Sequence, residues 1–545
     1  MIILILILVL FTVGAGFMIF PGTYFLVDFV PTPVWTLSKW IFDESFFRLG
    51  LDLLNKIFWY IFFSKIFFVL LLFLAAYLGL LRAKYFVSKL DIKDKNIAIL
   101  MQVCSIFFFA INPFLYESMI TQVGIFAFIL AVWYGIYFLL KGQEHRLNYL
   151  YSAVCLGVSW MITPHSIFFI WLILLFYFLY FYHTFSRKKI WKFFIIIIIL
   201  NLNWLVWTFF LNKNSTVQSI SSFTQANINS FQPNSLNNLW VEITSALGYW
   251  FWTEKYHYFT LPWEVNDKRF VAWILLLLMS LFGSFSLIKN KDTQKIWLFF
   301  ITIWFLAFVL WNGISSTAFG WLNNFLYKYI PFYSGFRDPH KWIWLWMLIF
   351  GINFAAWIYY FYELIGNIVI KNEKDKKTFF LNKYVWIVIV FWLIIAYCPS
   401  VLFAFKWQLF LTDYPDDYTK ARNILISQQN NEKVLVLPWH SYMACSRTNW
   451  RIIANTMDKF FKPLDVIVSD NIEIWNLYTN STRSLSKDVE EFLKTKDISL
   501  LKKNNIWYIV NLRTCANFSD YGFLNKLENT EGIYNSDKID VLKLK

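Results

Sequence analysis

Long apolar runs alternate with short polar segments through most of the chain. A membrane-spanning helix needs roughly 20 apolar residues, and eleven segments reach or approach that length. They lie near residues 1–20, 60–81, 96–112, 119–140, 149–163, 166–182, 193–211, 270–288, 296–311, 342–365 and 384–405. The pattern predicts a membrane all-α bundle of about eleven transmembrane helices in residues 1–405.

Residues 406–545 follow a different pattern, in which short strand-like runs alternate with short helical ones. The runs typical of strands are Val434–Leu437, Val466–Val468, Ile506–Val510 and Ile539–Leu544, and those typical of helices are Asp488–Leu493 and Phe523–Leu527. This alternation predicts a small C-terminal α/β domain. Because no glycine-rich phosphate loop follows any of these strands, the pattern argues against a nucleotide-binding domain.

The composition agrees with a membrane protein. Of the 545 residues, 58% are hydrophobic and 15% are charged, whereas a soluble globular chain is about 25% charged. This excludes a soluble enzyme, a disordered chain and a small disulfide-rich scaffold.

The net charge of +15 is concentrated in alternate loops. Residues before the predicted domain boundary include 30 basic and 17 acidic side chains, and the C-terminal domain has 19 and 17. Five short loops hold 19 of the basic residues; they lie at 82–95, 141–148, 183–192, 289–295 and 366–383. Basic loops stay on the cytoplasmic side, so we expect an integral cell-membrane protein with a cytoplasmic N-terminus and an extracytoplasmic C-terminal domain, and no nucleic-acid partner.

The N-terminal region predicts two further helices. Residues 1–20 lack a basic n-region and a small-residue cleavage site, so a retained first helix is favoured over a secretory signal. In residues 43–58, Arg48, Asp52 and Lys56 recur every four positions among apolar residues. This spacing favours an amphipathic helix in the outer interface; the alternative is an early, bent start of the second span.

Asp28 is the first candidate for chemistry. It lies in an apolar segment shortly after the first predicted span and is followed by Pro31 and Pro33, which restrict the backbone. Apolar surroundings raise the pKa of a carboxyl group, which suits a general base. The alternative is an ordinary exposed loop acid.

A second candidate lies in the segment 332–342, directly before a span. Arg337, His340 and Lys341 place three cationic or potentially cationic side chains within five residues. Arginine binds phosphate oxygens with two parallel donors and lysine acts as a point charge, so the three suit the phosphate of a lipid-linked substrate. The alternative is a general headgroup anchor beside the interfacial aromatics Trp342 and Trp344.

Other predicted outer loops supply candidates for lining a cavity or binding an acceptor. These are Glu117, His165, Trp252, Glu254 and His257. Aromatic rings next to charged groups suit sugars, and they equally suit a membrane interface. For Glu117 the alternative is favourable placement at a helix N-terminus, and for His165 an interfacial position without a chemical role.

The five cysteines show no zinc-ligand spacing. Cys104, Cys155 and Cys398 fall in predicted spans and are interpreted as packed apolar side chains. Cys445 and Cys515 fall in the predicted extracytoplasmic domain, where a disulfide is chemically permitted. The sequence leaves open whether they meet.

In order along the chain, these features resemble the GT-C superfamily of polytopic membrane glycosyltransferases, in particular its YfhO-like and arabinofuranosyltransferase-like branches. The resemblance is carried by Asp28, the helix at 43–58, Asn112–Glu117, Gly335–Trp342 and Val434–His440. It implies that Asp28 is the base that activates the acceptor and that the sugar donor is a polyprenyl phosphate used on the non-cytoplasmic side. Many members pair acids in the first outer loop, whereas here Asp28 is followed next by Asp43 and Glu44.

The sequence therefore predicts a glycosyltransferase that moves a sugar from a polyprenyl-phosphate donor to a cell-envelope glycan or lipid. The requirement for a divalent metal, the sugar and the acceptor stay open. The alternative is a non-enzymatic transporter or flippase, or an envelope assembly protein. Ion coupling has weak support because the predicted spans hold few charges, with Lys65 and Glu363 near their ends.

Overall fold

The structure is a computed structural model of the chain. It describes residues 23–24, 59–112, 123–145, 147–163, 166–184, 187–209, 269–314, 318–330, 333–336, 339–368, 383–398, 411–428, 432–446, 452–471, 473–474, 477–478, 483–516 and 518–545. These residues group into two compact units. The first unit comprises the described part of Phe67–Gln408, and the second comprises that of Leu409–Lys545 with β1 (Thr23–Tyr24) and the first turns of α4. The boundary predicted at residue 405 lies outside the described residues.

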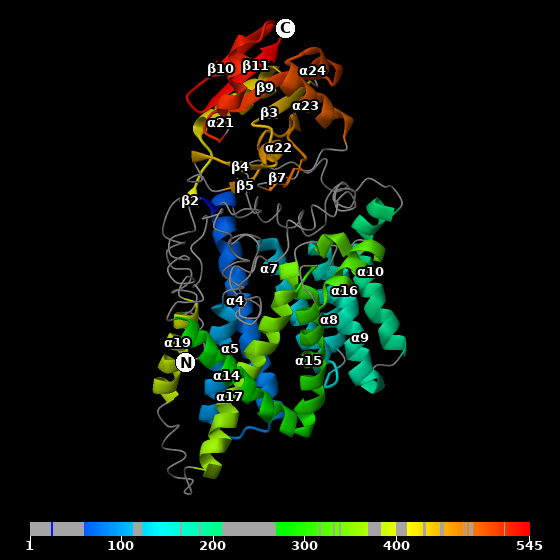
Figure 1. The fold of residues 1–545 in the computed structure, drawn as a ribbon, viewed down its shortest axis with the longest axis vertical. Coiled ribbons are helices and arrows are strands. Elements are labelled where there is room, and N and C mark those ends of the chain that lie inside the picture. Colours follow the sequence, from blue (N-terminus) through cyan, green and yellow to red (C-terminus); the bar gives the residue numbers. More distant parts are fainter. Residues whose placement is uncertain are drawn as a thin grey trace. The chain divides into compact units, whose positions relative to one another are not determined.

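The first unit is a bundle of apolar helices (Figure 1). They are α4 (Trp59–Lys89), α5 (Lys95–Ala110), α7 (Val123–Lys141), α8 (Leu147–Ile162), α9 (Ser166–Phe181), α10 (Arg187–Phe209), α14 (Arg269–Lys289), α15 (Lys291–Trp311), α16 (Gly320–Tyr329), α17 (Ile343–Ile368) and α19 (Lys383–Tyr397). Within the described residues, five of them contain an apolar stretch long enough to cross a membrane, in α4, α7, α14, α15 and α17. The chain is thus a multi-pass membrane protein.

Most predicted spans coincide with a helix of the bundle. The predicted span at 1–20 and the interfacial helix at 43–58 lie outside the described residues. Between α15 and α17 the structure contains α16, which the sequence pattern did not predict. Several helices, including α5, α8 and α9, have 16 residues each, so their length alone does not establish a crossing.

Small residues allow neighbouring helices to approach closely. A Cβ atom on Gly283 of α14 would lie 1.8 Å from the backbone oxygen of Asn353 in α17. A Cβ atom on Gly79 of α4 would lie 2.6 Å from the backbone oxygen of Ser105 in α5. Side chains at these positions would push the helices apart, which matters in a membrane because association there depends on close packing.

Arg82 corrects one part of the sequence prediction. It was counted among the basic residues of the loop at 82–95, but α4 continues to Lys89, and Arg82 is 3% exposed inside the bundle. Its Nη2 donates to the backbone oxygen of Trp133 at 2.9 Å, and its guanidinium lies 5.8 Å and 5.9 Å from the ring centroids of Phe109 and Phe300. Aromatic faces and a helix carbonyl therefore replace water around this cation.

The second unit contains a five-stranded mixed sheet in the order β10-β11-β9-β3-β6. Its strands are β3 (Lys433–Leu437), β6 (Asp465–Ile467), β9 (Ile506–Leu512), β10 (Thr530–Asn535) and β11 (Ile539–Leu544). β3 pairs in parallel with β6 and β9, whereas β11 pairs antiparallel with β9 and β10. Four of these strands were predicted from the sequence, and β10 was not.

Helices cover both faces of this sheet. On one face, Val434 and Val436 of β3 pack in a core with side chains of α21 (Asp416–Gln428) and α22 (Met457–Phe460). On the other face, Leu435 packs with side chains of α23 (Ser484–Thr495) and α24 (Ser499–Lys503). The helix predicted at Asp488–Leu493 lies within α23, and the one predicted at Phe523–Leu527 overlaps a 3₁₀ helix, Phe518–Lys526.

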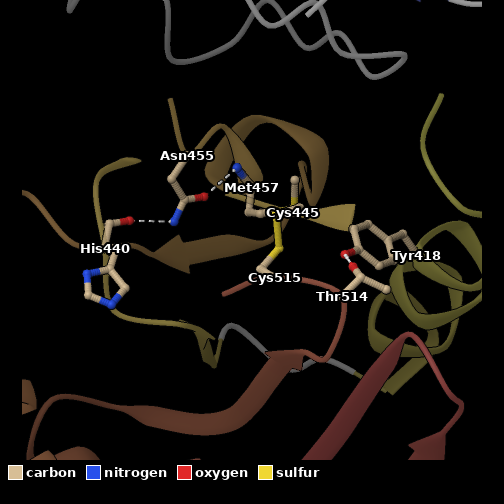
Figure 2. The surroundings of a disulfide bond; sticks show 7 residues. All are labelled: Tyr418, His440, Cys445, Asn455, Met457, Thr514 and Cys515. Atoms are coloured by element: carbon tan, nitrogen blue, oxygen red, sulfur yellow. Dashed lines mark hydrogen bonds between the residues drawn. A yellow bond between two sulfur atoms is a disulfide. The ribbon is translucent and has the colours of Figure 1, made fainter. Parts of the chain in front are cut away.

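A buried disulfide joins Cys445 to Cys515 across 70 positions of the chain. Cys445 follows β4 (Tyr442–Ala444), which pairs with β5 (Ile452–Ala454), and Cys515 follows β9. Figure 2 shows that Tyr418 of α21 and Thr514 form a 2.9 Å hydrogen bond beside it. Asn455 donates from Nδ2 to the backbone oxygen of His440 and accepts from the backbone N–H of Met457. The disulfide thus fastens the β4–β5 hairpin to the end of β9.

We expect the double variant Cys445→Ser/Cys515→Ser to lower the stability of the second unit by about 4 kcal/mol. The estimate follows from the loop-closure entropy of a cross-link of 70 residues. Differential scanning fluorimetry should show a lower unfolding midpoint for this variant, whereas Cys155→Ser, which removes a free thiol of the bundle, should leave the second unit unchanged. An identical midpoint with and without the disulfide would contradict its structural role.

Candidate functional site

The candidate site is built on the connection between α15 and α17. After α15 the chain turns at Gly313, which has φ of 61°. Asn323 of α16 is 1% exposed, and its Nδ2 donates to the backbone oxygen of Gly313 at 3.1 Å and, more weakly, to that of Val309 at 3.4 Å. These bonds fix α16 to the end of α15.

Two tyrosines then connect α16 to the short 3₁₀ helix η4 (Tyr333–Phe336). The Tyr327 hydroxyl donates to the backbone oxygen of Phe336 at 2.6 Å, and the Tyr333 hydroxyl donates to Oδ1 of Asn323 at 3.3 Å. Burial raises the pKa of the Tyr333 phenol well above its usual value. The phenol therefore stays protonated at neutral pH and acts as a donor that positions η4.

Three buried rings hold the two ends of the candidate segment, and we call Phe169, Phe336 and Trp342 the aromatic clamp. Phe336 is 0% exposed and Trp342 is 1% exposed, and their rings stack with centroids 5.1 Å apart. Phe169, in the first turn of α9, lies 4.4 Å from Trp342 and 5.2 Å from Phe336. The chain therefore leaves this ring cluster after Phe336 and returns to it at Trp342.

The predicted phosphate-binding residues lie between Phe336 and Trp342 of this clamp along the chain. Lys341 belongs to the second 3₁₀ helix, η5 (Pro339–Trp342), and is 8% exposed. A lysine is rarely buried to this extent. Phe336 and Trp342, the described residues on either side of 337–341, are both anchored in this packed core.

Ring contacts also join the helix ends that flank the other predicted loops. Phe109, next to the last residue of α5, lies 5.2 Å from Trp133 of α7, and Trp133 lies 6.3 Å from Trp344 in the first turn of α17. Phe169 of α9 is 5.0 Å from Trp344. The end of α5 and the starts of α9 and α17 thus belong to one aromatic core at one end of the bundle.

The chain matches solved structures along its whole length. The cryo-EM structure of the arabinofuranosyltransferase AftD from mycobacteria matches with a TM-score of 0.59 and 10% sequence identity, over 100% of this chain and 40% of AftD. The chain has the GT-C fold. A structure of an AftD variant matches with a TM-score of 0.53 at 10% identity, over 91% of this chain and 36% of that one. The crystal structure of apo ArnT from Cupriavidus metallidurans matches with a TM-score of 0.49 at 10% identity, over 99% of this chain and 97% of ArnT. By sequence, no protein-family model and no curated protein matches the chain.

Most of the predicted site residues lie outside the described residues. These are Asp28, Glu117, His165, Trp252, Glu254, His257 and Arg337. The backbone of His340 belongs to η5, while its side chain is outside the described part. Lys341 is described in full. Glu117 follows α5 in the chain, His165 directly precedes α9, and Arg337 precedes α17. The aromatic core joins these three helix ends.

Trp342 and Trp344, interpreted from the sequence as interfacial aromatics, are buried in the bundle. Trp342 is 1% exposed and Trp344 is 0% exposed, because Phe169 packs against both rings. The sequence prediction also missed Phe169 and Asn323, which support the segment. Phe169 lies in a uniformly apolar run, so the sequence holds no signal that distinguishes it from its neighbours.

The described residues contain no group of three or more His, Cys, Asp or Glu side chains that could hold a metal ion. Asp28, Glu117 and Glu254 lie outside the described residues.

We expect Trp342→Ala to destabilise the clamp by about 3 kcal/mol or more, as is usual for truncating a buried aromatic side chain. Phe336 and Phe169 would lose the ring that packs against them, so the thermal midpoint in detergent should fall, and any activity that depends on this part of the chain should fall with it. Trp342→Phe keeps a stacking ring on Phe336 and should lose much less. Equal midpoints for the wild type and Trp342→Ala would contradict the role of the clamp.

Proposed function

We propose that this chain is a glycosyltransferase that moves a sugar from a polyprenyl-phosphate donor to a cell-envelope glycan or lipid on the extracytoplasmic side. The observation that carries the proposal lies at one end of a bundle that has the GT-C fold. There the buried, stacked rings of Phe336 and Trp342 flank the predicted phosphate-binding residues, and Lys341 is buried beside Trp342. A lipid donor keeps its tail in the bilayer, so its phosphate must be bound where the helices end.

In this proposal the acceptor hydroxyl attacks the anomeric carbon of the sugar. The new C–O bond forms as the bond between that carbon and the phosphate oxygen breaks, and polyprenyl phosphate leaves with the bonding electron pair. Asp28 takes the proton of the acceptor hydroxyl. Arg337 and Lys341, with His340 beside them, stabilise the negative charge that develops on the leaving phosphate.

The remaining residues concern the acceptor. Glu117 and His165 lie in segments that follow α5 and precede α9, whose ends meet in the aromatic core. Trp252, Glu254 and His257 supply rings and polar groups suited to a sugar ring. We propose that these five line the acceptor side of the site, with the second unit and its disulfide facing the oxidising, extracytoplasmic space.

The buried Arg82 is the observation that favours the transporter alternative, because intramembrane charges often mark an ion path. In the described part of the chain, however, its contacts are a carbonyl and aromatic rings, and it forms no ion pair with a carboxylate. A relay needs successive titratable groups, so Arg82 supports the transporter proposal weakly.

The test uses the full chain in nanodiscs with a lipid extract of bacterial envelopes as acceptor. Decaprenyl-phosphate sugars, including arabinofuranose, and UDP-linked sugars are supplied separately, and the released decaprenyl phosphate or UDP is measured. The proposal expects release of decaprenyl phosphate with labelled product from at least one lipid-linked sugar. Consumption of UDP-sugars alone, or transport of lipid-linked sugar across liposomes without any product, would contradict it.

A further inference from the structure

A polar pocket lies at the other end of the bundle, away from the aromatic clamp. It has a volume of about 290 Å³ and is formed by the last turn of α14, the start of α15 and the later turns of α17. Its lining includes Ser286, Lys289, Asn290, Tyr359, Tyr360 and Glu363. This volume is near the lower limit for sites that bind small molecules.

The pocket contains opposite charges that do not neutralise each other. Lys289 and Glu363 both line it and are both exposed, and the described residues show no ion pair between them at 4 Å or less. The Tyr359 hydroxyl donates to Oε1 of Glu363 at 2.7 Å, which leaves Oε2 for another donor. A ligand with one negative and one positive group can therefore pair with both side chains at once.

Hydrogen-bond donors collect on the α14–α15 side of the pocket. Asn290 uses its side-chain oxygen to cap α15 by accepting from the backbone N–H of Asp292 at 2.8 Å, so its Nδ2 remains as a donor. The Nδ2 group, the ammonium of Lys289 and the N-terminus of the 21-residue helix α15 all favour an anion. The anionic part of the ligand should therefore lie on the α14–α15 side.

An exposed apolar stripe leads along α14 to this pocket. Its members recur every three or four positions and are Val271, Leu275, Leu278, Phe282 and Phe285. The rings of Phe282 and Phe285 lie 5.9 Å and 6.0 Å from that of Tyr360, which belongs to the pocket wall. A molecule bound in the pocket can thus lay a hydrocarbon chain on the stripe, which is the shape of a membrane lipid.

We propose that this pocket binds the headgroup of a phosphatidylethanolamine-type lipid. The phosphate contacts Lys289 and Asn290, and the primary ammonium donates to Oε2 of Glu363 and lies beside the ring of Tyr360. A purely anionic headgroup would leave Glu363 facing like charge, and a choline headgroup has no N–H to donate to it. Pockets with basic residues between transmembrane helices are known places of lipid recognition.

The test is native mass spectrometry of the full-length protein titrated with three phospholipids that have the same acyl chains: phosphatidylethanolamine, phosphatidylglycerol and phosphatidylcholine. We expect phosphatidylethanolamine to bind at least fivefold more tightly than the other two. Glu363→Gln should abolish this preference, and Lys289→Gln should weaken all three lipids by a similar factor. The control Lys291→Gln changes an exposed neighbouring lysine outside the pocket lining and should change nothing.

Equal affinity for the three lipids in the wild type, or a retained preference in Glu363→Gln, would overturn the proposal. Equal binding of phosphatidylcholine and phosphatidylethanolamine would overturn the role of the primary ammonium in particular. Where Glu363→Gln yields too little folded protein, Lys289→Gln alone decides, because unchanged affinities in that variant are incompatible with a phosphate at Lys289. These outcomes are independent of sugar transfer.

Discussion

The Asp28→Asn variant should fold and insert normally but lose transfer activity by about 10²- to 10⁴-fold, the usual contribution of a general base. Asparagine keeps the size and hydrogen-bonding shape of the side chain but cannot take a proton. The loss should appear in kcat, because the acceptor and the lipid donor can still bind. Decaprenyl phosphate released per minute by purified protein in nanodiscs is the measurement.

The matched control is Asp52→Asn, which alters an acid on the polar face of the predicted interfacial helix at 43–58 and should retain activity. The pH profile provides a second readout, since a base is lost as the pH falls below the pKa of its carboxyl group. We expect the wild-type rate to decline at low pH and the residual rate of Asp28→Asn to be nearly independent of pH. Wild-type activity in Asp28→Asn would remove Asp28 from the mechanism.

Replacement of Arg337 with glutamine should reduce kcat/KM by about 10- to 150-fold, which corresponds to loss of a charge-assisted hydrogen bond worth about 1.5–3 kcal/mol. The effect should fall on both KM for the lipid donor and kcat, because the phosphate gains charge as it departs. Arg337→Lys keeps the charge without the planar pair of donors, so it should recover a part of the activity.

Lys341→Gln tests binding of the same donor phosphate at the C-terminal end of the segment 337–341. Because Lys341 is 8% exposed and belongs to the clamped turn, thermal stability has to be measured beside activity. A lowered affinity for decaprenyl phosphate at an unchanged midpoint supports the phosphate role. If both Arg337→Gln and Lys341→Gln bind the donor as the wild type does, the phosphate is held elsewhere.

The bundle could be predicted from the sequence because a continuous apolar run predicts a membrane-spanning helix. Three of the four predicted strands, β3, β9 and β11, are likewise largely buried and rich in β-branched or aliphatic residues. β6 is exposed or half-buried but was predicted from its run of β-branched residues, Val466–Val468. β10 was missed because its sequence, with Gly532 and largely exposed or half-buried positions, carries little of that pattern. α16 is short and amphipathic, and its Asn323 is buried by contacts that its own sequence does not reveal.

The burial of Arg82 and Trp342 could not be predicted from the sequence, for a common reason. Both were interpreted by their place along the chain, as a loop cation and as an interfacial aromatic. Their burial depends on distant partners, the backbone of Trp133 for Arg82 and the ring of Phe169 for Trp342. Sequence spacing indicates which residues are neighbours on one helix, but it does not indicate contacts between helices. The cluster of cationic residues at 332–342 could therefore be singled out from the sequence, whereas the packing of Phe169 against Trp342 could not.

The most direct test of the proposed function is a cryo-EM structure of the wild-type protein in nanodiscs with decaprenyl phosphate. We expect density for the phosphate beside Arg337 and Lys341, between the starts of α9 and α17, and loss of that density in Arg337→Gln/Lys341→Gln. A phosphate bound at a different position in the wild type, with the segment 337–341 unoccupied, would contradict the assignment of the donor site.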